Sequence, residues 1–254
     1  MDVIKIGGNE IDDPSFLPRL AQAVDRVGQP VTIVHGGGRA IAGMQMKLGL
    51  EPRKIDGLRV TDEQSLQVTQ MVLSGDVNKR VVQALLERGV PAVGLSGVDG
   101  GLLRCEKKHY NQQDLGWVGQ IVSVERRVLD LFAREGFTPV VSPVSLGLDG
   151  AIYNVNADEV AGAIAAAMGA SKAWFISNVA AVLDGSGQPI AGITAAEGTR
   201  LIQNGAIRDG MIPKVHAALD LVAAGVSEVI ITNIDGLLTG VGTRFSLPSS
   251  KHGQ

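Results

Sequence analysis

The chain has 254 residues, of which 45% are hydrophobic and 19% charged, and a formal net charge of -3 at pH 7. That composition is typical of a folded globular protein, and the slightly acidic balance excludes a broad basic field for nucleic acid or an anionic membrane surface. The single cysteine excludes an intrachain disulfide, and the four histidines show no metal-ligand spacing. With no apolar run near the roughly 20 residues that span a bilayer and no signal-peptide pattern, we expect a cytoplasmic protein.

The first fifty residues alternate between strand and helix patterns. Residues 3–6 form a short β-branched run that ends at a glycine pair, and residues 31–35 form a second run that ends at three glycines. Helical spacing follows each run, over about 14–27 and 39–48. This order predicts an α/β fold with a parallel sheet.

The alternation continues to the end of the chain. A break near residue 170 marks a candidate boundary between two lobes, and the polar segment 101–123 predicts hairpins that form an antiparallel edge or lid. The other expected elements are a helix pair over 62–88, helices near 125–135, 157–168, 194–203 and 211–224, and strands at 91–95, 138–142, 172–177 and 227–232.

A lysine beside two glycines is the first sign of a functional site. Lys5 interrupts an apolar strand, where an unpaired ammonium would be costly to bury. Gly7 and Gly8 follow it, and free backbone N–H groups at a strand end can receive an anion. Glycines 36–38 repeat this pattern at the start of a helix. Both clusters predict a phosphate site at the carboxyl ends of the strands, although tight packing explains the glycines equally well.

Further polar residues fit phosphate chemistry, each with an ordinary alternative. Lys214 begins a predicted helix, where a cation opposes the helix dipole, but a solvated surface lysine is also consistent with the pattern. Asp158 follows the helix cap Asn156 and can either complement the dipole or hold two lysines between phosphate groups. The Arg59 guanidinium is suited to binding a substrate carboxylate or, alternatively, to forming an ion pair at the surface. His35 is interpreted as structural.

Motifs of nucleophilic catalysis, P-loops and dinucleotide binding are missing from the sequence. A phosphoryl transfer to a carboxylate needs no such nucleophile, because the acceptor is already an anion near neutral pH. Catalysis of this kind consists of alignment and charge compensation.

Five short motifs occur in the order seen in the N-acetylglutamate kinases, and the chain resembles these members of the amino acid kinase family from residue 2 to about 244. The motifs are KIGG at 5–8, HGGG at 35–38, GLRVTD at 57–62, NVNAD at 154–158 and GMIPKV at 210–215, supported by LGWVG at 115–119 and SNV at 177–179.

The resemblance implies a three-layer αβα sandwich around a mainly parallel sheet. Its N-terminal lobe, residues 1–170, would bind the acyl amino acid and form a homodimer, and its C-terminal lobe, residues 171–254, would bind ATP with Mg²⁺ carried by the nucleotide. The implied reaction phosphorylates the side-chain carboxylate of N-acetyl-L-glutamate to N-acetylglutamyl 5-phosphate, in arginine biosynthesis.

The resemblance also assigns roles to single residues. Lys5 and Lys214 would stabilise the transferring phosphoryl group, and Asp158 would orient both lysines. Substrate binding is assigned to Gly37, Gly38, Arg59 and Asn154. Nucleotide binding is assigned to Gly7, Gly8, Ser177, Asn178, Leu183 and Met211.

Some positions depart from the family pattern. Ala181 stands where glycine is usual, and Asn9 stands where a smaller residue is common. The chain shows no extra N-terminal helix of the kind found in arginine-inhibited members, and its segment 233–242 is short. We therefore expect a simple dimer without arginine feedback.

Three alternatives remain at the level of sequence. A kinase for carrier-linked α-aminoadipate in lysine biosynthesis would use the same phosphate residues, although its second glycine motif is expected to be HGGS. A sensor that binds nucleotide or amino acid without turnover would not need Lys5, Asp158 and Lys214. A dehydrogenase is disfavoured, since the dinucleotide fingerprint is missing.

Overall fold

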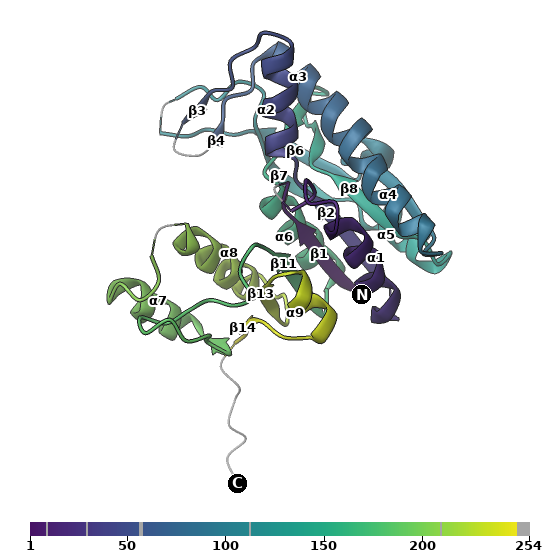
Figure 1. Ribbon diagram of the computed structural model, residues 1–254. Helices are drawn as coiled ribbons and strands as arrows, with labels where there is room; N and C mark the ends of the chain where they lie inside the picture. The colour runs from purple at the N-terminus through teal and green to yellow at the C-terminus, as the bar shows by residue number, and fades with distance from the viewer. Residues whose placement is uncertain (9, 29, 56–57, 112, 209, 248–254) are drawn as a thin grey trace.

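Eight strands form one central sheet in the computed structural model, which describes residues 1–8, 10–28, 30–55, 58–111, 113–208 and 210–247 (Figure 1). The strand order is β12-β14-β13-β11-β1-β2-β8-β5, and every neighbouring pair is parallel except β13 and β14. The strands are β1 (Asp2–Ile6), β2 (Val31–His35), β5 (Ala92–Ser96), β8 (Thr138–Ser142), β11 (Lys172–Ile176), β12 (Gly192–Ile193), β13 (Val229–Thr232) and β14 (Thr243–Phe245).

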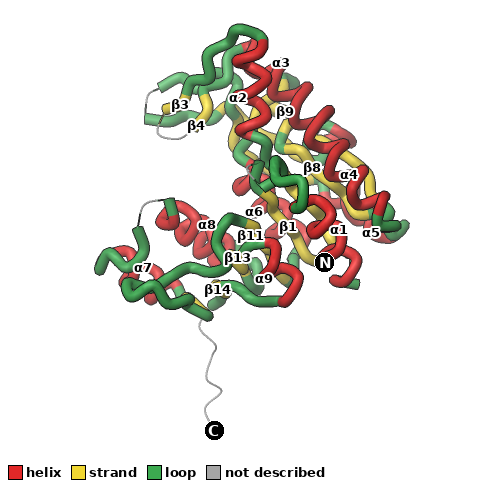
Figure 2. Tube along the Cα trace, in the orientation of Figure 1, coloured by secondary structure: helices red, strands yellow, loops and turns green. Residues whose placement is uncertain are grey.

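Helices cover both faces of this sheet, as Figures 1 and 2 show. Alternate residues of β1 enter different cores: Val3 packs with α5, α6 and α8, whereas Ile4 and Ile6 pack with α1 and α4. The predicted α/β fold with a mainly parallel sheet is therefore confirmed. The helices are α1 (Phe16–Val27), α2 (Gly38–Lys47), α3 (Glu63–Gln70), α4 (Asn78–Glu87), α5 (Arg126–Arg134), α6 (Ala157–Met168), α7 (Ala195–Gln203), α8 (Met211–Ala223) and α9 (Ile234–Thr239).

A smaller sheet and a short hairpin lie beside the central sheet. The smaller sheet has the order β10-β9-β6-β7 and includes the antiparallel hairpin predicted within 101–123. It shares a core with α6 through the buried side chains of Leu103, Cys105 and Tyr153. These strands are β6 (Leu103–Lys107), β7 (Gly119–Val124), β9 (Val144–Gly147) and β10 (Ile152–Asn154), and the separate hairpin is β3 (Lys54–Ile55) with β4 (Leu58–Arg59).

Two helices were predicted over 62–88, but the structure has one continuous helical run there, so the prediction of two separate helices is wrong. A π-helical turn, Met71–Val77, joins α3 to α4, and the residues at both junctions keep right-handed helical angles. Buried Val72, Leu73 and Val77 hold the run against the core, which compensates for the low helix propensity of Gly75. Asp62 caps the start of the run, since its carboxylate accepts a hydrogen bond from the Ser65 N–H at 2.8 Å.

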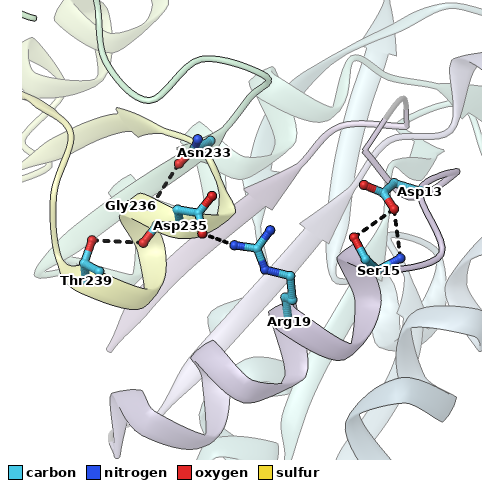
Figure 3. Close-up of polar contacts among 7 residues, drawn as sticks. All are labelled: Asp13, Ser15, Arg19, Asn233, Asp235, Gly236 and Thr239. Carbon is cyan, nitrogen blue, oxygen red and sulfur yellow. Dashed lines mark hydrogen bonds and ion pairs between the residues drawn. The ribbon is translucent and has the colours of Figure 1, made fainter.

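The candidate boundary near residue 170 coincides with a division of the central sheet. Strands β1, β2, β5 and β8 come from the first part of the chain, and the four strands from β11 onward come from the second. The first helix and α9 also join the two parts, because Arg19 of α1 forms an ion pair with Asp235 (Figure 3). Asn233 caps α9 by accepting from the Gly236 N–H at 2.9 Å. The assignment of acyl amino acid and ATP to the two parts remains a prediction.

His35 is enclosed at the end of β2, which supports its structural interpretation. Its side chain is fully buried, with Nε2 3.2 Å from Nδ2 of Asn78 and Nδ1 3.0 Å from the carbonyl oxygen of Gly36. Burial lowers the pKa of His35 to about 4, so the imidazole stays neutral at physiological pH.

We expect the free energy of unfolding to fall by about 2 kcal/mol between pH 7 and pH 5 through His35 alone. The unfolded imidazole, with a pKa of about 6.5, binds a proton over this range and the folded one does not, so stability is lost as the pH falls. Urea unfolding at both pH values measures the effect. His35→Gln should reduce this pH dependence, and an unchanged dependence in that variant would contradict the prediction.

Candidate active site

Lys5 and Asp158 form an ion pair at the carboxyl end of β1. Lys5 follows Val3 by two residues, so its side chain projects from the same face of the sheet, toward α6. Asp158 lies in the first turn of α6, and its Oδ1 is 2.8 Å from the Lys5 Nζ. The Lys5 side chain is only 15% exposed, and Asp158 supplies the negative charge that its burial requires.

Lys214 approaches the same pair from the other half of the sheet. It lies in the first turn of α8 and donates a hydrogen bond to the Ser177 hydroxyl, just beyond β11. Burial lowers the pKa of Lys214, and the positive charge of Lys5 lowers it further, against the opposing effects of Glu10 and Asp158. The three charged residues predicted to act together all line one cavity.

These residues line a cavity of about 650 Å³, which we call the first cavity. Four other predicted residues, Gly7, Gly8, Gly38 and Ser177, also line it. Five further polar residues of its wall were not predicted as site residues: Glu10, Lys108, Asn156, Glu159 and Asp220. Asn156 was interpreted only as a helix cap, and no motif marks the other four.

Three residues predicted for the nucleotide are not among the described residues that line the first cavity. Asn178 is exposed beside Ser177, and Leu183 is exposed in a bridge with Pro189. Met211 begins α8 and packs on the core shared with α6. Their assignment to the nucleotide remains a prediction, and Asn9 lies outside the described residues.

The two glycine turns pack directly on each other. A Cβ built on Gly8 would lie 2.6 Å from Cα and 2.7 Å from N of Gly37, and a Cβ on Gly37 would lie 2.5 Å from the Leu73 side chain. Close packing therefore requires glycine at position 8, where the obstacle is backbone, and disfavours a side chain at position 37, where Leu73 would have to move. The same packing brings the backbone of both turns to the cavity walls, so the packing and anion-binding interpretations are compatible.

A second cavity of about 240 Å³ contains the residues predicted for the acyl amino acid: Gly37, Gly38, Arg59 and Asn154. Arg59 donates to Oε1 of Gln45 at 2.7 Å and to the Gly38 carbonyl at 2.8 Å. Burial lowers the pKa of Arg59, but a guanidinium remains charged. Asn154 donates to the Thr61 hydroxyl at 3.2 Å.

The two cavities adjoin, since Gly38 and Asn156 line both. Lys5 and Lys214 face the first cavity, and Arg59 faces the second, with donors not used by Gln45 and Gly38. An anionic chain in the first cavity and a carboxylate in the second can meet beside Gly38. The arrangement is suited to moving a phosphoryl group between them.

Lys108 and Glu159 tie the β6–β7 hairpin to α6 at the edge of the first cavity. The Lys108 Nζ lies 3.0 Å from Oε2 of Glu159, whose Oε1 accepts a hydrogen bond from the Ile121 N–H at 2.7 Å. These two contacts fix the hairpin to α6, so it forms one wall of the first cavity.

Comparisons with known proteins identify the relatives of this chain. The model of the amino acid kinase family matches residues 2–233. The chain belongs to the amino acid kinase family. Among the similar members of this family is the acetylglutamate kinase of Chloroflexus aurantiacus, 46% identical over 97% of this chain and 96% of the relative. The acetylglutamate kinase of Methanopyrus kandleri is 43% identical over 96% of this chain and 99% of the relative.

A solved structure shares the overall fold of the chain. The structure of smu.665 from Streptococcus mutans has a TM-score of 0.82 and 30% identity, covering 97% of this chain and 98% of that one. The match to the family model confirms the amino acid kinase resemblance predicted from five short motifs. Within the described residues, no helix is both long and apolar enough to cross a membrane.

Proposed function

We propose that this amino acid kinase is an acetylglutamate kinase, which transfers the γ-phosphoryl group of ATP to the side-chain carboxylate of N-acetyl-L-glutamate. The relatives that carry this name are 41–48% identical to the chain over nearly its full length. The product is N-acetylglutamyl 5-phosphate, an intermediate of arginine biosynthesis.

The observation that carries the proposal is that Lys5, Asp158 and Lys214 all line the first cavity, which shares Gly38 and Asn156 with the second. The ATP phosphates occupy the first cavity, and the acyl amino acid occupies the second. Both ammonium groups compensate the charge that shifts from ATP to the acceptor during transfer, while Asp158 fixes the position of Lys5.

The acceptor needs no general base in this scheme, because its carboxylate is ionised near neutral pH. Arg59 and Asn154 bind the rest of the acyl amino acid, and the backbone N–H groups of Gly8 and Gly38 contact phosphoryl oxygens. The chain contributes positioning and charge compensation in place of covalent catalysis.

The proposal has three further parts: magnesium is carried by ATP, the chain forms a homodimer through its N-terminal part, and the protein is cytoplasmic. Glu10, Asp158 and Asp220 bring carboxylates to the first cavity, but the described residues contain no group of three or more His, Cys, Asp or Glu side chains that could hold a metal ion. This donor set fits a magnesium ion bound mainly by the nucleotide, where it would shield the phosphate charge.

The acceptor is tested by supplying ATP with N-acetylglutamate, glutamate or carrier-linked α-aminoadipate and trapping the acyl phosphate with hydroxylamine. We expect turnover with N-acetylglutamate and little or none with the other two. Turnover confined to the carrier-linked acid would assign the chain to the lysine pathway. Binding of ATP without turnover on any acceptor would favour a sensor.

A further inference from the structure

The β3–β4 hairpin places two cations side by side at the second cavity. Lys54 lies directly opposite Arg59 in the antiparallel pair. Residues opposite each other project from the same face of a hairpin, and both side chains line the second cavity. Like charges in such a pair are destabilising, and an isolated hairpin of two-residue strands has little other stabilisation.

No negative side chain compensates this pair within the described part of the chain. Neither Lys54 nor Arg59 forms an ion pair there, and no aspartate or glutamate is among the described residues that line the second cavity. The groups that Arg59 contacts, the Gln45 amide and the Gly38 carbonyl, are neutral. Lys54 is exposed, so water solvates its ammonium in the unliganded chain and leaves its charge free to meet an anionic ligand in the second cavity.

We propose that Lys54 acts with Arg59 to bind the α-carboxylate of the acceptor, which makes Lys54 a determinant of specificity for a dianionic substrate. This inference rests on the proposed function, because N-acetylglutamate carries a second carboxylate besides the one that is phosphorylated. Lys54 lines the second cavity but not the first, where Lys5 and Lys214 already serve the phosphoryl group. Its charge is thus available to the part of the acceptor that does not react.

The test compares ligands that differ only at the α-carboxylate. Dissociation constants are measured by calorimetry for N-acetyl-L-glutamate and for its α-carboxamide, whose side-chain carboxylate is intact. The variants are Lys54→Met, Lys54→Gln and the charge-conserving Lys54→Arg. Lys47→Met is the matched control, since Lys47 is an exposed lysine of α2 that lines neither cavity.

We expect Lys54→Met and Lys54→Gln to weaken N-acetylglutamate binding about tenfold, the lower end of the range for a hydrogen bond to a charged group. Binding of the carboxamide and of a non-hydrolysable ATP analogue should change less than about twofold, since neither presents a carboxylate to Lys54. Lys54→Arg should retain most of the affinity, and Lys47→Met all of it. Thermal unfolding of each unliganded variant checks that the fold is kept.

An equal loss for the acid and the carboxamide would overturn the inference, because Lys54 would then act through the shape of the hairpin. Unchanged affinity for N-acetylglutamate, or a loss confined to the ATP analogue, would overturn it as well. A wild-type protein that neither binds nor phosphorylates N-acetylglutamate would instead refute the proposed function, so the two failures are distinguishable.

Discussion

Replacing Lys214 by alanine is expected to lower kcat by about 10³-fold, while the dissociation constant for ATP changes by less than about tenfold. Lys214 and Lys5 both line the first cavity, and burial lowers the pKa of the Lys214 ammonium. A charge held in a partly desolvated site interacts strongly with a phosphoryl group, and most strongly when negative charge shifts during transfer. Initial rates with hydroxylamine trapping and equilibrium binding of ATP separate the two effects.

The structure also supplies controls for this variant. Alanine is a good helix former, so the first turn of α8 should be kept. Ser177→Ala removes only the hydroxyl that accepts from Lys214 and should cost much less activity than loss of the ammonium. Equal losses in kcat and in ATP affinity for Lys214→Ala would point to a binding role for this lysine, as expected of a sensor.

Replacing Gly8 by alanine is expected to lower kcat by about 100-fold and the free energy of unfolding by about 1–3 kcal/mol. The new Cβ would lie 2.6 Å from the Gly37 Cα, 2.7 Å from the Gly37 N and 2.9 Å from the Gly38 N. All three are backbone atoms, so no flexible side chain can move aside. The two turns must separate, and the backbone donors proposed for the phosphoryl group separate with them.

Gly43 provides the matched control for this substitution. It lies inside α2, and a Cβ built there has no atom within 4 Å. Gly43→Ala should leave kcat unchanged and raise stability by up to about 1 kcal/mol, because alanine loses less backbone entropy in a helix. Urea unfolding and initial rates measure both variants. A Gly8→Ala protein with wild-type rate and stability would contradict the packing of the turns.

Local sequence was sufficient for most elements of the fold. Strands over 31–35 and 138–142 and the helix over 157–168 are present as predicted, since their periodicity and bounding turn residues are encoded by neighbours in the chain. The division of 62–88 into two helices was wrong, because packing of Leu73 and Val77 outweighs the low propensity of one glycine. Strands β9 and β10 were not predicted, because β9 is stabilised by pairing with the distant strand β6, and β10 by pairing with β9, rather than by their own short sequences.

The candidate site was also predicted only in part from the sequence. Motifs pointed to Lys5, Asp158, Lys214 and Arg59 as separate residues, each with an ordinary alternative, and it was their resemblance to a family that predicted a common role. The pairing of Lys54 with Arg59 could not be predicted from the sequence, because a lysine five residues before an arginine matches no motif. The two residues become a pair only because the hairpin places them opposite each other.

The amino-acid sequence by itself determined the alternation of strands and helices, the glycine turns and the family, because these depend on residues close together in the chain. Only the tertiary structure decided that Lys214 and Lys5 line one cavity, that the two cavities share Gly38 and Asn156, and that no described acid forms an ion pair with the hairpin cations. These relations depend on how the sheet aligns strand ends that are far apart in sequence, and local propensity does not determine that alignment.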